Sequence, residues 1–137
     1  MLTKIRKATK GEEGFTLIEL MVVILIIGIL MAIAIPSFFA VRNRAYKASA
    51  VSVRTTAVKT MELYGTDHDG EYTGANATEL VALEPAIEFA DSGAVEDVAV
   101  ISGVGARSYT ISVTGRDAIA YTAVKTDGGA VAYTPAP

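Results

Sequence analysis

Residues 15–41 read FTLIELMVVILIIGILMAIAIPSFFAV, an apolar run in which Glu19 carries the only charge. About 20 apolar residues, each rising ~1.5 Å along a helix, cross the ~30 Å hydrocarbon core of a bilayer. The 27 residues of this run are therefore enough for a helix that spans a membrane. We predict such a helix over residues 15–41, with membrane lipid as its surroundings.

Charge is segregated on either side of this run. Residues 1–14, the leader, carry four basic and two acidic side chains, and residues 42–65 carry five basic and one acidic. Residues 66–137 carry three basic and eleven acidic side chains, a net charge of −8. Lys and Arg precede the span, and the positive-inside rule applied to this leader predicts that it stays in the cytoplasm and that everything beyond Val41 lies on the far side. Nucleic-acid binding is not established by these charges, since the acidic region would repel phosphates.

The composition of the 137-residue chain excludes several kinds of chemistry. With no cysteine and with His68 as its one histidine, the chain has no disulfide, no thiolate nucleophile and no multi-histidine metal site. No GxSxG motif accompanies His68, so a Ser/His/Asp triad is not expected. Asp67–Glu71 offers carboxylates around Gly70 but lacks the spacing of a calcium loop, and we interpret it as a solvated acidic turn. We therefore predict no enzymatic activity, no cofactor and no metal site.

A cleaved signal peptide would share the basic start and the apolar run. Ala32, Ile33 and Ala34 imitate the small-x-small pattern of its cleavage site. The run is, however, longer than the ~7–15 apolar residues of a signal core, and it continues into an amphipathic segment without a loop. The sequence therefore favours a retained anchor over cleavage near Ile35.

Glu19 is a carboxylate inside an apolar helix. Such a group costs a few kcal/mol at the centre of a bilayer and less near its surface, and intramembrane acids are functional hypotheses by default. The alternative is that Glu19, only four residues inside the apolar boundary, extends its carboxylate to the lipid headgroups. Periodicity alone does not decide between the two interpretations.

Residues 14–19 read GFTLIE, after a short basic leader and before the apolar run. This combination of a small residue, a phenylalanine, an acid four positions later and an apolar helix resembles the processing and assembly signature of type IV prepilins and pseudopilins. The resemblance covers residues 11–65 and is only architectural beyond them. It implies that a prepilin peptidase cuts between Gly14 and Phe15 and then methylates the new amine of Phe15. It also implies that Glu19 pairs with the Phe15 ammonium of an adjacent subunit.

Two residues interrupt the apolar helix. Pro36 cannot donate a backbone hydrogen bond to Ala32, and Gly28 weakens a helix interior by roughly 1 kcal/mol relative to alanine. One interpretation is a kink of the kind that transmembrane helices tolerate. The resemblance to pilins implies another, in which residues 28–36 unwind on packing and make a filament extensible.

Apolar residues recur at spacings of three and four over residues 42–65, which predicts an amphipathic continuation of the helix. Its apolar face comprises Ala50, Val53, Ala57, Met61 and Tyr64. The charged side chains expected away from that face are Arg44, Lys47, Arg54 and Lys59. Gly65 offers a stop, so that one helix would run from Phe15 to Tyr64.

Residues 66–97 are rich in turn formers and are predicted to be a connecting loop with a short helix. Asn76 and Glu79 have the spacing of a capping box, which starts this helix. The helix extends through Leu83, and Pro85 closes it.

Residues 98–137 are predicted to form an antiparallel meander of three or four strands that packs on the helix. Apolar or alternating runs are separated by glycine-rich turns, as is typical of hairpins. The runs are Val98–Ser102, Ser108–Thr114, Ala118–Val124 and Ala130–Thr134. Asp127 and Gly128 form a strong hairpin signal. The predicted fold class is α+β, a long N-terminal helix packed against a small antiparallel head.

The primary prediction is a structural subunit of a type IV pilus, in the bacterial cytoplasmic membrane before assembly and in a surface or periplasm-spanning filament afterwards. The partners that the resemblance implies are a prepilin peptidase and methyltransferase, other pilin subunits, and a pilus assembly platform with its motor. One alternative is a pseudopilin of a type II secretion or DNA-uptake machine. Another is an extracytoplasmic binding domain that the apolar segment merely tethers to the membrane.

Overall fold

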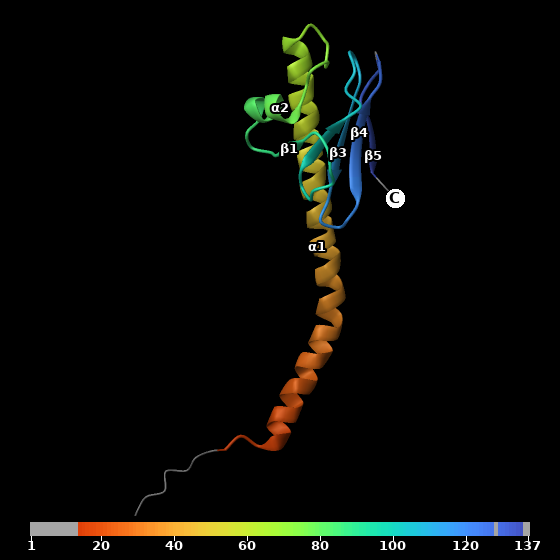
Figure 1. Ribbon diagram of the computed structural model, residues 1–137. Coiled ribbons are helices and arrows are strands. Elements are labelled where there is room, and N and C mark those ends of the chain that lie inside the picture. The colour runs from red at the N-terminus through yellow and green to blue at the C-terminus, as the bar shows by residue number, and fades with distance from the viewer. Residues whose placement is uncertain (1–13, 128, 136–137) are drawn as a thin grey trace, which may run out of the picture. The chain divides into compact units, whose positions relative to one another are not determined.

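The structure is a computed structural model that describes residues 14–127 and 129–135. Of the predicted leader, only Gly14 lies among these residues. The chain divides into two compact units, one ending at Phe39 and the other beginning at Ala40. Helix α1 contributes its N-terminal part to the first unit, and its C-terminal part to the second, which also holds a small sheet (Figure 1).

Helix α1 comprises Leu17–Asp67 and is helical through both Gly28 and Pro36. Gly65 does not end the helix, as the sequence had predicted, because it serves a different purpose. A Cβ atom at this position would lie 2.6 Å from Cε1 of Tyr72. Glycine is therefore required for the close approach of the tyrosine ring, and the helix continues past it.

The second unit carries a sheet of five strands in the order β1-β2-β3-β4-β5. The strands are β1 Phe89–Ala90, β2 Ala99–Ser102, β3 Tyr109–Thr114, β4 Ala120–Lys125 and β5 Ala132–Pro135. Strands β2 to β5 pair antiparallel, which confirms the predicted meander. Strand β1 pairs parallel with β2 and was not predicted. A strand of two residues is too short to show an alternating pattern, so the sequence carried no signal for it.

The last hairpin joins β4 to β5. The Gly129 N–H donates to the carbonyl of Thr126 at 3.0 Å, which closes a turn. Of the pair that predicted this hairpin, Asp127 is described, whereas Gly128 lies outside the described residues.

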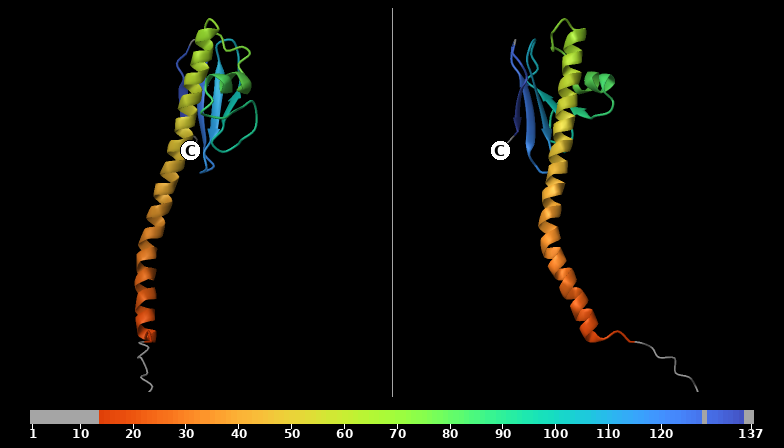
Figure 2. Two further views of the ribbon diagram at one scale, coloured as in Figure 1. Left: turned by 90° about the vertical axis from the view of Figure 1, so that its left-hand side faces the viewer. Right: turned by 180° about the vertical axis from the view of Figure 1, so that it is seen from behind.

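Helix α2 comprises Ala77–Leu83, and Asn76 caps its N-terminus as predicted, whereas the Glu79 carboxylate does not return the second hydrogen bond of a capping box. The side-chain oxygen of Asn76 accepts a hydrogen bond from the Glu79 backbone N–H at 3.1 Å. Leu80 is fully buried and anchors the helix. Within the second unit, α2 and β1 lie on one side of α1 and β4 and β5 on the other (Figures 1 and 2).

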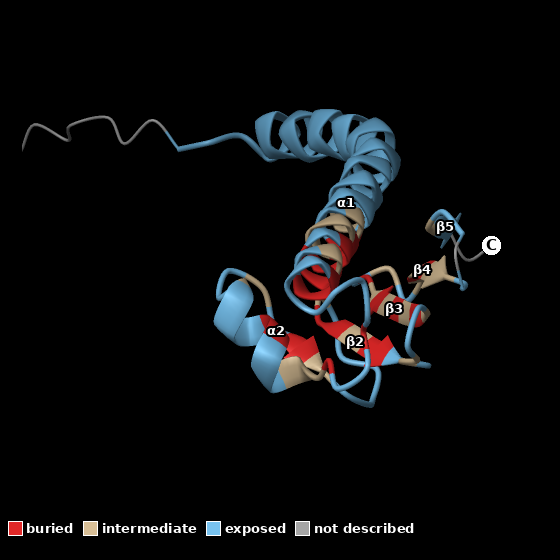
Figure 3. Ribbon diagram, turned by 90° about the horizontal axis from the view of Figure 1, so that it is seen from above, coloured by how far each residue is buried: buried red, intermediate tan, exposed pale blue. Residues whose placement is uncertain are grey.

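The core of the second unit lies between α1 and the sheet (Figure 3). Tyr109, Ile111 and Val113 of β3 are buried and alternate with partly exposed residues, as their sequence pattern predicts. The described buried residues of α1 all fall in its C-terminal part: Ala50, Arg54, Ala57, Val58, Thr60, Met61, Tyr64 and Gly65. The C-terminal part of α1 is thus the structural support of the head.

Arg54 corrects the predicted distribution of charge, because it lies in the buried stripe and not away from it. Only 8% of the residue is exposed. Its Nη1 donates to the carbonyl of Thr122 on β4 at 3.2 Å, and the guanidinium lies 5.0 Å from the ring centroid of Tyr133 on β5. The alkyl part of the side chain can pack as an apolar residue does, while the guanidinium contacts the carbonyl of Thr122 and the ring of Tyr133. A pattern based on apolar residues alone misses such a position.

Candidate functional site

The first turn of α1 is closed by Thr16 and Glu19. The Glu19 carboxylate accepts hydrogen bonds from the Thr16 backbone N–H at 3.3 Å and from Thr16 Oγ1 at 3.1 Å. In return, the Glu19 backbone N–H donates to Thr16 Oγ1 at 3.3 Å. This reciprocal arrangement is a capping box, and it explains why α1 begins at Leu17 and not at Phe15.

The capping box gives Glu19 a partner within its own chain. This role of Glu19 as a helix cap differs from the two that its sequence position predicted, a functional carboxylate in the membrane and one that reaches the headgroups. The signal was present, because Thr16 and Glu19 have the Ser/Thr-x-x-Glu spacing before an apolar run. A carboxylate with two hydrogen-bond donors costs less to desolvate than a bare one, which makes the position tolerable near a bilayer.

Gly14 and Phe15 precede the helix and lie on an exposed, non-helical backbone. A Cβ atom at Gly14 would meet nothing within 4 Å, and Phe15 is 83% exposed. The peptide bond between them is therefore open to a protease that binds an extended backbone.

The N-terminal part of α1 presents its large apolar side chains without cover. Its residues from Leu17 to Phe39 are all exposed. Among the residues described, α1 is the one helix long and apolar enough, by length and composition, to cross a membrane. A bare apolar surface of this size marks a membrane or a protein contact.

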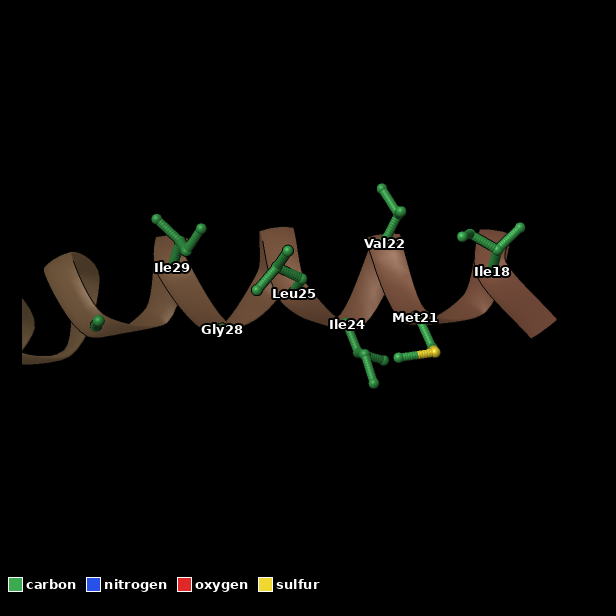
Figure 4. A pocket seen from close by; sticks show the side chains of 8 residues that line it. Ile18, Met21, Val22, Ile24, Leu25, Gly28 and Ile29 are labelled. Atoms are coloured by element: carbon green, nitrogen blue, oxygen red, sulfur yellow. The ribbon is translucent and has the colours of Figure 1, made fainter.

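Gly28 makes a notch in this apolar surface. Figure 4 shows Ile18, Val22 and Ile29 pointing to one side of α1 and Ile24 to the opposite side, with no side chain at Gly28. A Cβ atom at Gly28 would meet nothing within 4 Å. The missing side chain lets another apolar segment approach the α1 backbone, as small residues do between membrane helices.

A polar cluster joins the C-terminal part of α1 to the sheet. The Lys125 ammonium lies 2.6 and 2.8 Å from the two carboxylate oxygens of Glu62. The Tyr109 hydroxyl donates to Glu62 at 2.5 Å and the Tyr72 hydroxyl at 3.0 Å, while Lys125 also donates to Tyr72 at 2.7 Å. Glu62 therefore ties α1 to β3, to β4 and to the loop after α1 at once.

The protonation of this cluster follows from its contacts. Burial acts to raise the pKa of Glu62, but hydrogen bonds from Lys125, Tyr109 and Tyr72 outweigh it and lower the pKa below 4.5. Burial acts to lower the pKa of Lys125, but the hydrogen bonds to Glu62 and Tyr72 raise it above 10.5. The pKa of Tyr109 is raised by burial and by its bond to Glu62. At neutral pH Glu62 and Lys125 are therefore a charged pair, and with the hydroxyls of Tyr72 and Tyr109 they form a structural lock between α1 and the sheet.

The acidic turn Asp67–Glu71 lies at the C-terminal end of α1, where Asp69 and Gly70 adopt positive φ. Across the part of the chain that the structure describes, no group of three His, Cys, Asp or Glu residues is placed to hold a metal ion. His68 stacks on Tyr64 with 3.9 Å between ring centroids, and its Nδ1 lies 2.8 Å from the Tyr64 carbonyl. His68 is thus engaged with its own helix.

A family model described as the prokaryotic N-terminal methylation motif matches residues 9–35. These residues include the Gly14–Phe15 bond, the capping box and Gly28. The chain therefore has an N-terminal methylation motif at the start of an apolar helix.

Several curated proteins are similar to the chain. It is 42% identical over 74 residues to the type IV wide pilus major component of Thermus thermophilus, covering 54% of this chain and 55% of that protein. It is 37% identical over 62 residues to the type II secretion system core protein G of Escherichia coli, covering 45% and 43%. It is 38% identical over 77 residues to a fimbrial protein of Neisseria meningitidis, covering 56% and 45%. The predicted resemblance to type IV pilins and pseudopilins is confirmed.

The chain spans about half the length of the curated relatives it matches. No solved structure matches it. The family relationship therefore rests on the N-terminal motif and on these partial matches, and the fold of the head rests on the structure described above.

Proposed function

We propose that this chain is the structural subunit of a type IV pilus filament and polymerises through the N-terminal part of α1. The observation that carries the proposal is the exposed apolar surface from Leu17 to Phe39, together with the methylation motif that includes its N-terminal end. Water is a poor solvent for such a surface, so lipid or other copies of the helix must cover it.

Maturation begins with the leader, residues 1–14. A prepilin peptidase hydrolyses the bond between Gly14 and Phe15, and the new amine of Phe15 is methylated. The open backbone around Gly14 supports this site of cleavage. The products are a free leader and a subunit that starts with a positively charged phenylalanine.

Glu19 then selects the register of assembly. Its carboxylate exchanges the intrachain bonds with Thr16 for the Phe15 ammonium of an adjacent subunit. Two unit charges ~4 Å apart attract by ~4 kcal/mol at an effective dielectric of ~20. That attraction offsets much of the cost of burying the charges in the correct register and little of it in a wrong one.

Assembly exchanges one apolar environment for another. Before assembly the span, residues 15–41, lies in the cytoplasmic membrane, with the amphipathic segment 42–65, the loop 66–97 and the sheet 98–137 outside. In the filament the same side chains contact other helices. Because lipid and neighbouring helices are comparably apolar, the transfer is nearly balanced, and an assembly platform with a motor can drive it either way.

Gly28 and Pro36 are the proposed points of flexibility in this span. Pro36 leaves the Ala32 carbonyl without its helical donor, so residues 28–36 can unwind at a lower cost than the rest of α1. This is the second proposed role of the segment, beside the close helix approach that Gly28 allows.

A pseudopilin of a type II secretion machine is the second candidate function. The match to a type II secretion core protein favours it. Both candidates share cleavage, methylation and helical assembly, and they differ in how long the filament grows.

The N-terminus of the mature protein tests the proposal. Mass spectrometry of chain purified from its host membrane should find an N-methylated Phe15 as the first residue. Met1 as the first residue would indicate a plain anchor, and a start near Ile35 a cleaved signal peptide; either result contradicts the proposal. Electron microscopy of surface filaments, present in the parent strain and lost on deletion of the gene, separates a pilin from a pseudopilin.

A further inference from the structure

One flank of the second unit is acidic and partly apolar. Residues 60–106 contain ten Asp and Glu side chains and no Lys or Arg. We call residues 77–97 the acidic flank; it comprises α2, β1 and their loops. Six of the ten acids lie in it: Glu79, Glu84, Glu88, Asp91, Glu96 and Asp97. Apolar side chains lie exposed among them: Val81, Leu83 and Val95. Exposed apolar groups together with charged ones are typical of a protein interface.

Several of these acids have no partner of their own chain. Asp97 pairs with Arg116, and Asp91 accepts a hydrogen bond from the Ala77 backbone N–H. The carboxylates of Glu79 and Glu88 are exposed and make no hydrogen bond or ion pair with any described residue. The flank therefore retains negative charge that nothing within the described chain offsets.

A basic face lies on α1 below the head. Arg44, Lys47 and Val51 have spacings of three and four and so share one face of the helix, the basic stem face. Arg44 and Lys47 are exposed and without a charged partner among the described residues. Arg54, three residues beyond Val51, continues the same face and contacts β4 and β5. The basic stem face therefore points to the β4–β5 side of α1.

The two surfaces lie on opposite sides of one unit. The acidic flank is built on α2 and β1, whereas the basic stem face follows the side of β4 and β5 (Figures 1 and 2). A molecule with complementary patches on opposite sides associates head-to-tail, which gives an open helical assembly wherever the rotation between copies does not close a ring. Both patches belong to the same chain, so a second copy satisfies both.

We propose that the acidic flank of one copy docks on the basic stem face of the next copy. The inference rests on the proposed function, because it supplies a second contact for the filament in addition to the apolar helices. At physiological salt the Debye length is ~8 Å, so only charges in close contact contribute. The contact therefore acts on register and on partner choice more than on total affinity.

Charge reversal tests the proposal in the full chain, in its host, by filament yield relative to subunit in the membrane. Arg44→Glu with Lys47→Glu is the stem variant, and Glu79→Lys with Glu88→Lys is the flank variant. Each should lower the yield at least ~10-fold, because like charges then meet across the contact. The combination of all four restores complementarity and should return the yield to within ~3-fold of the parent.

The matched control reverses two other exposed cations, Lys59→Glu with Arg107→Glu, which changes the net charge by the same amount as the stem variant. It should leave the yield within ~2-fold of the parent. A control that loses as many filaments as the stem variant shows that net charge alone matters, and overturns the proposal. A stem variant that the flank reversal fails to rescue indicates a different partner, such as anionic lipid headgroups, and also overturns it.

Cross-linking gives a second readout that does not depend on yield. The chain has no cysteine, so introduced thiols are unique. Lys47→Cys with Glu88→Cys, bridged by a bifunctional maleimide in isolated filaments, should give a ladder of covalent multimers, and either single variant should not. Filaments without a ladder overturn this inference alone. A parent chain that forms no filaments in its host overturns the proposed function, and this inference with it.

Discussion

The two parts of α1 share one helical backbone and differ in what covers them. From Leu17 to Phe39 every residue is exposed, whereas from Ala50 to Gly65 one stripe is buried against the head. The C-terminal part has the pattern of a helix on the surface of a soluble protein, with an apolar stripe that faces the core and most charged side chains facing solvent. The N-terminal part is apolar all round, which is the pattern of a helix that is surrounded by lipid or by other helices. The contrast teaches that one helix can be half core and half interface.

The largest effect is expected at Glu19, where the N-terminal part carries its only charge. Glu19→Ala should leave membrane insertion intact while the yield of filaments falls at least ~100-fold, since an attraction of ~4 kcal/mol is lost per subunit pair. Insertion is measured by carbonate extraction of membranes and filament yield by shearing.

Thr16→Val separates the two roles of Glu19, since it removes the capping hydroxyl and leaves the carboxylate. It should cost only ~1 kcal/mol of helix stability and preserve most filaments. Equal losses in both variants would mean that Glu19 acts as a helix cap and not as a register selector.

The next prediction compares the stability effects of replacing one methionine in each part of α1. Met61 is fully buried in the C-terminal part of α1, and Met31 is 56% exposed in the N-terminal part. Met61→Ala should lower the free energy of unfolding by about 2–5 kcal/mol, because it leaves a cavity in the core. Met31→Ala should change it by less than ~0.5 kcal/mol. Denaturant titration of the full chain in detergent micelles, followed by tyrosine fluorescence, measures both.

The smallest effect is a pH dependence of the lock between Glu62 and Lys125. The pKa of Glu62 is lowered in the folded chain, so its contribution is present above pH 4.5 and is lost as the pH falls through the folded value. The pKa of Lys125 is raised, so its contribution is present below pH 10.5 and is lost as the pH rises through the folded value. Because 39% of the Glu62 side chain is exposed, solvent screening limits the effect to about 1 kcal/mol.

Unfolding titrations across this pH range measure the lock. Glu62→Gln should flatten the acid limb by that amount, whereas the exposed Glu71→Gln should leave it unchanged. A Glu62→Gln variant with the parent's acid limb would show that other carboxylates govern stability at low pH.

The sequence predicted the features that local pattern encodes. The apolar run predicted the uncovered part of α1, the alternation in Tyr109–Val113 predicted β3, and Asn76 with Glu79 predicted the start of α2. These features depend on neighbours within a few residues, which a linear pattern records.

The features that were missed depend on distant residues. Glu62 meets Tyr109 and Lys125, which lie 47 and 63 positions away, and Arg54 meets Thr122 across 68 positions. Gly65 was interpreted as a helix stop because the ring of Tyr72 that needs its space cannot be placed from the sequence. The capping box of Thr16 and Glu19 is the exception, since its signal was local and was overlooked in favour of the membrane role of the acid.

The attachment of α1 to β4 has a mechanical consequence. Arg54 holds the strand at Thr122 and Glu62 holds it at Lys125, two fastenings on one strand that runs alongside the helix (Figure 1). Tension applied along the helix axis loads both fastenings together in shear, whereas peeling would break them one after the other. Shear resistance slows forced unfolding, which is governed by the rate of unfolding and not by equilibrium stability. A fibre of such subunits would transmit a pull through its stalks while the domains they carry stay folded.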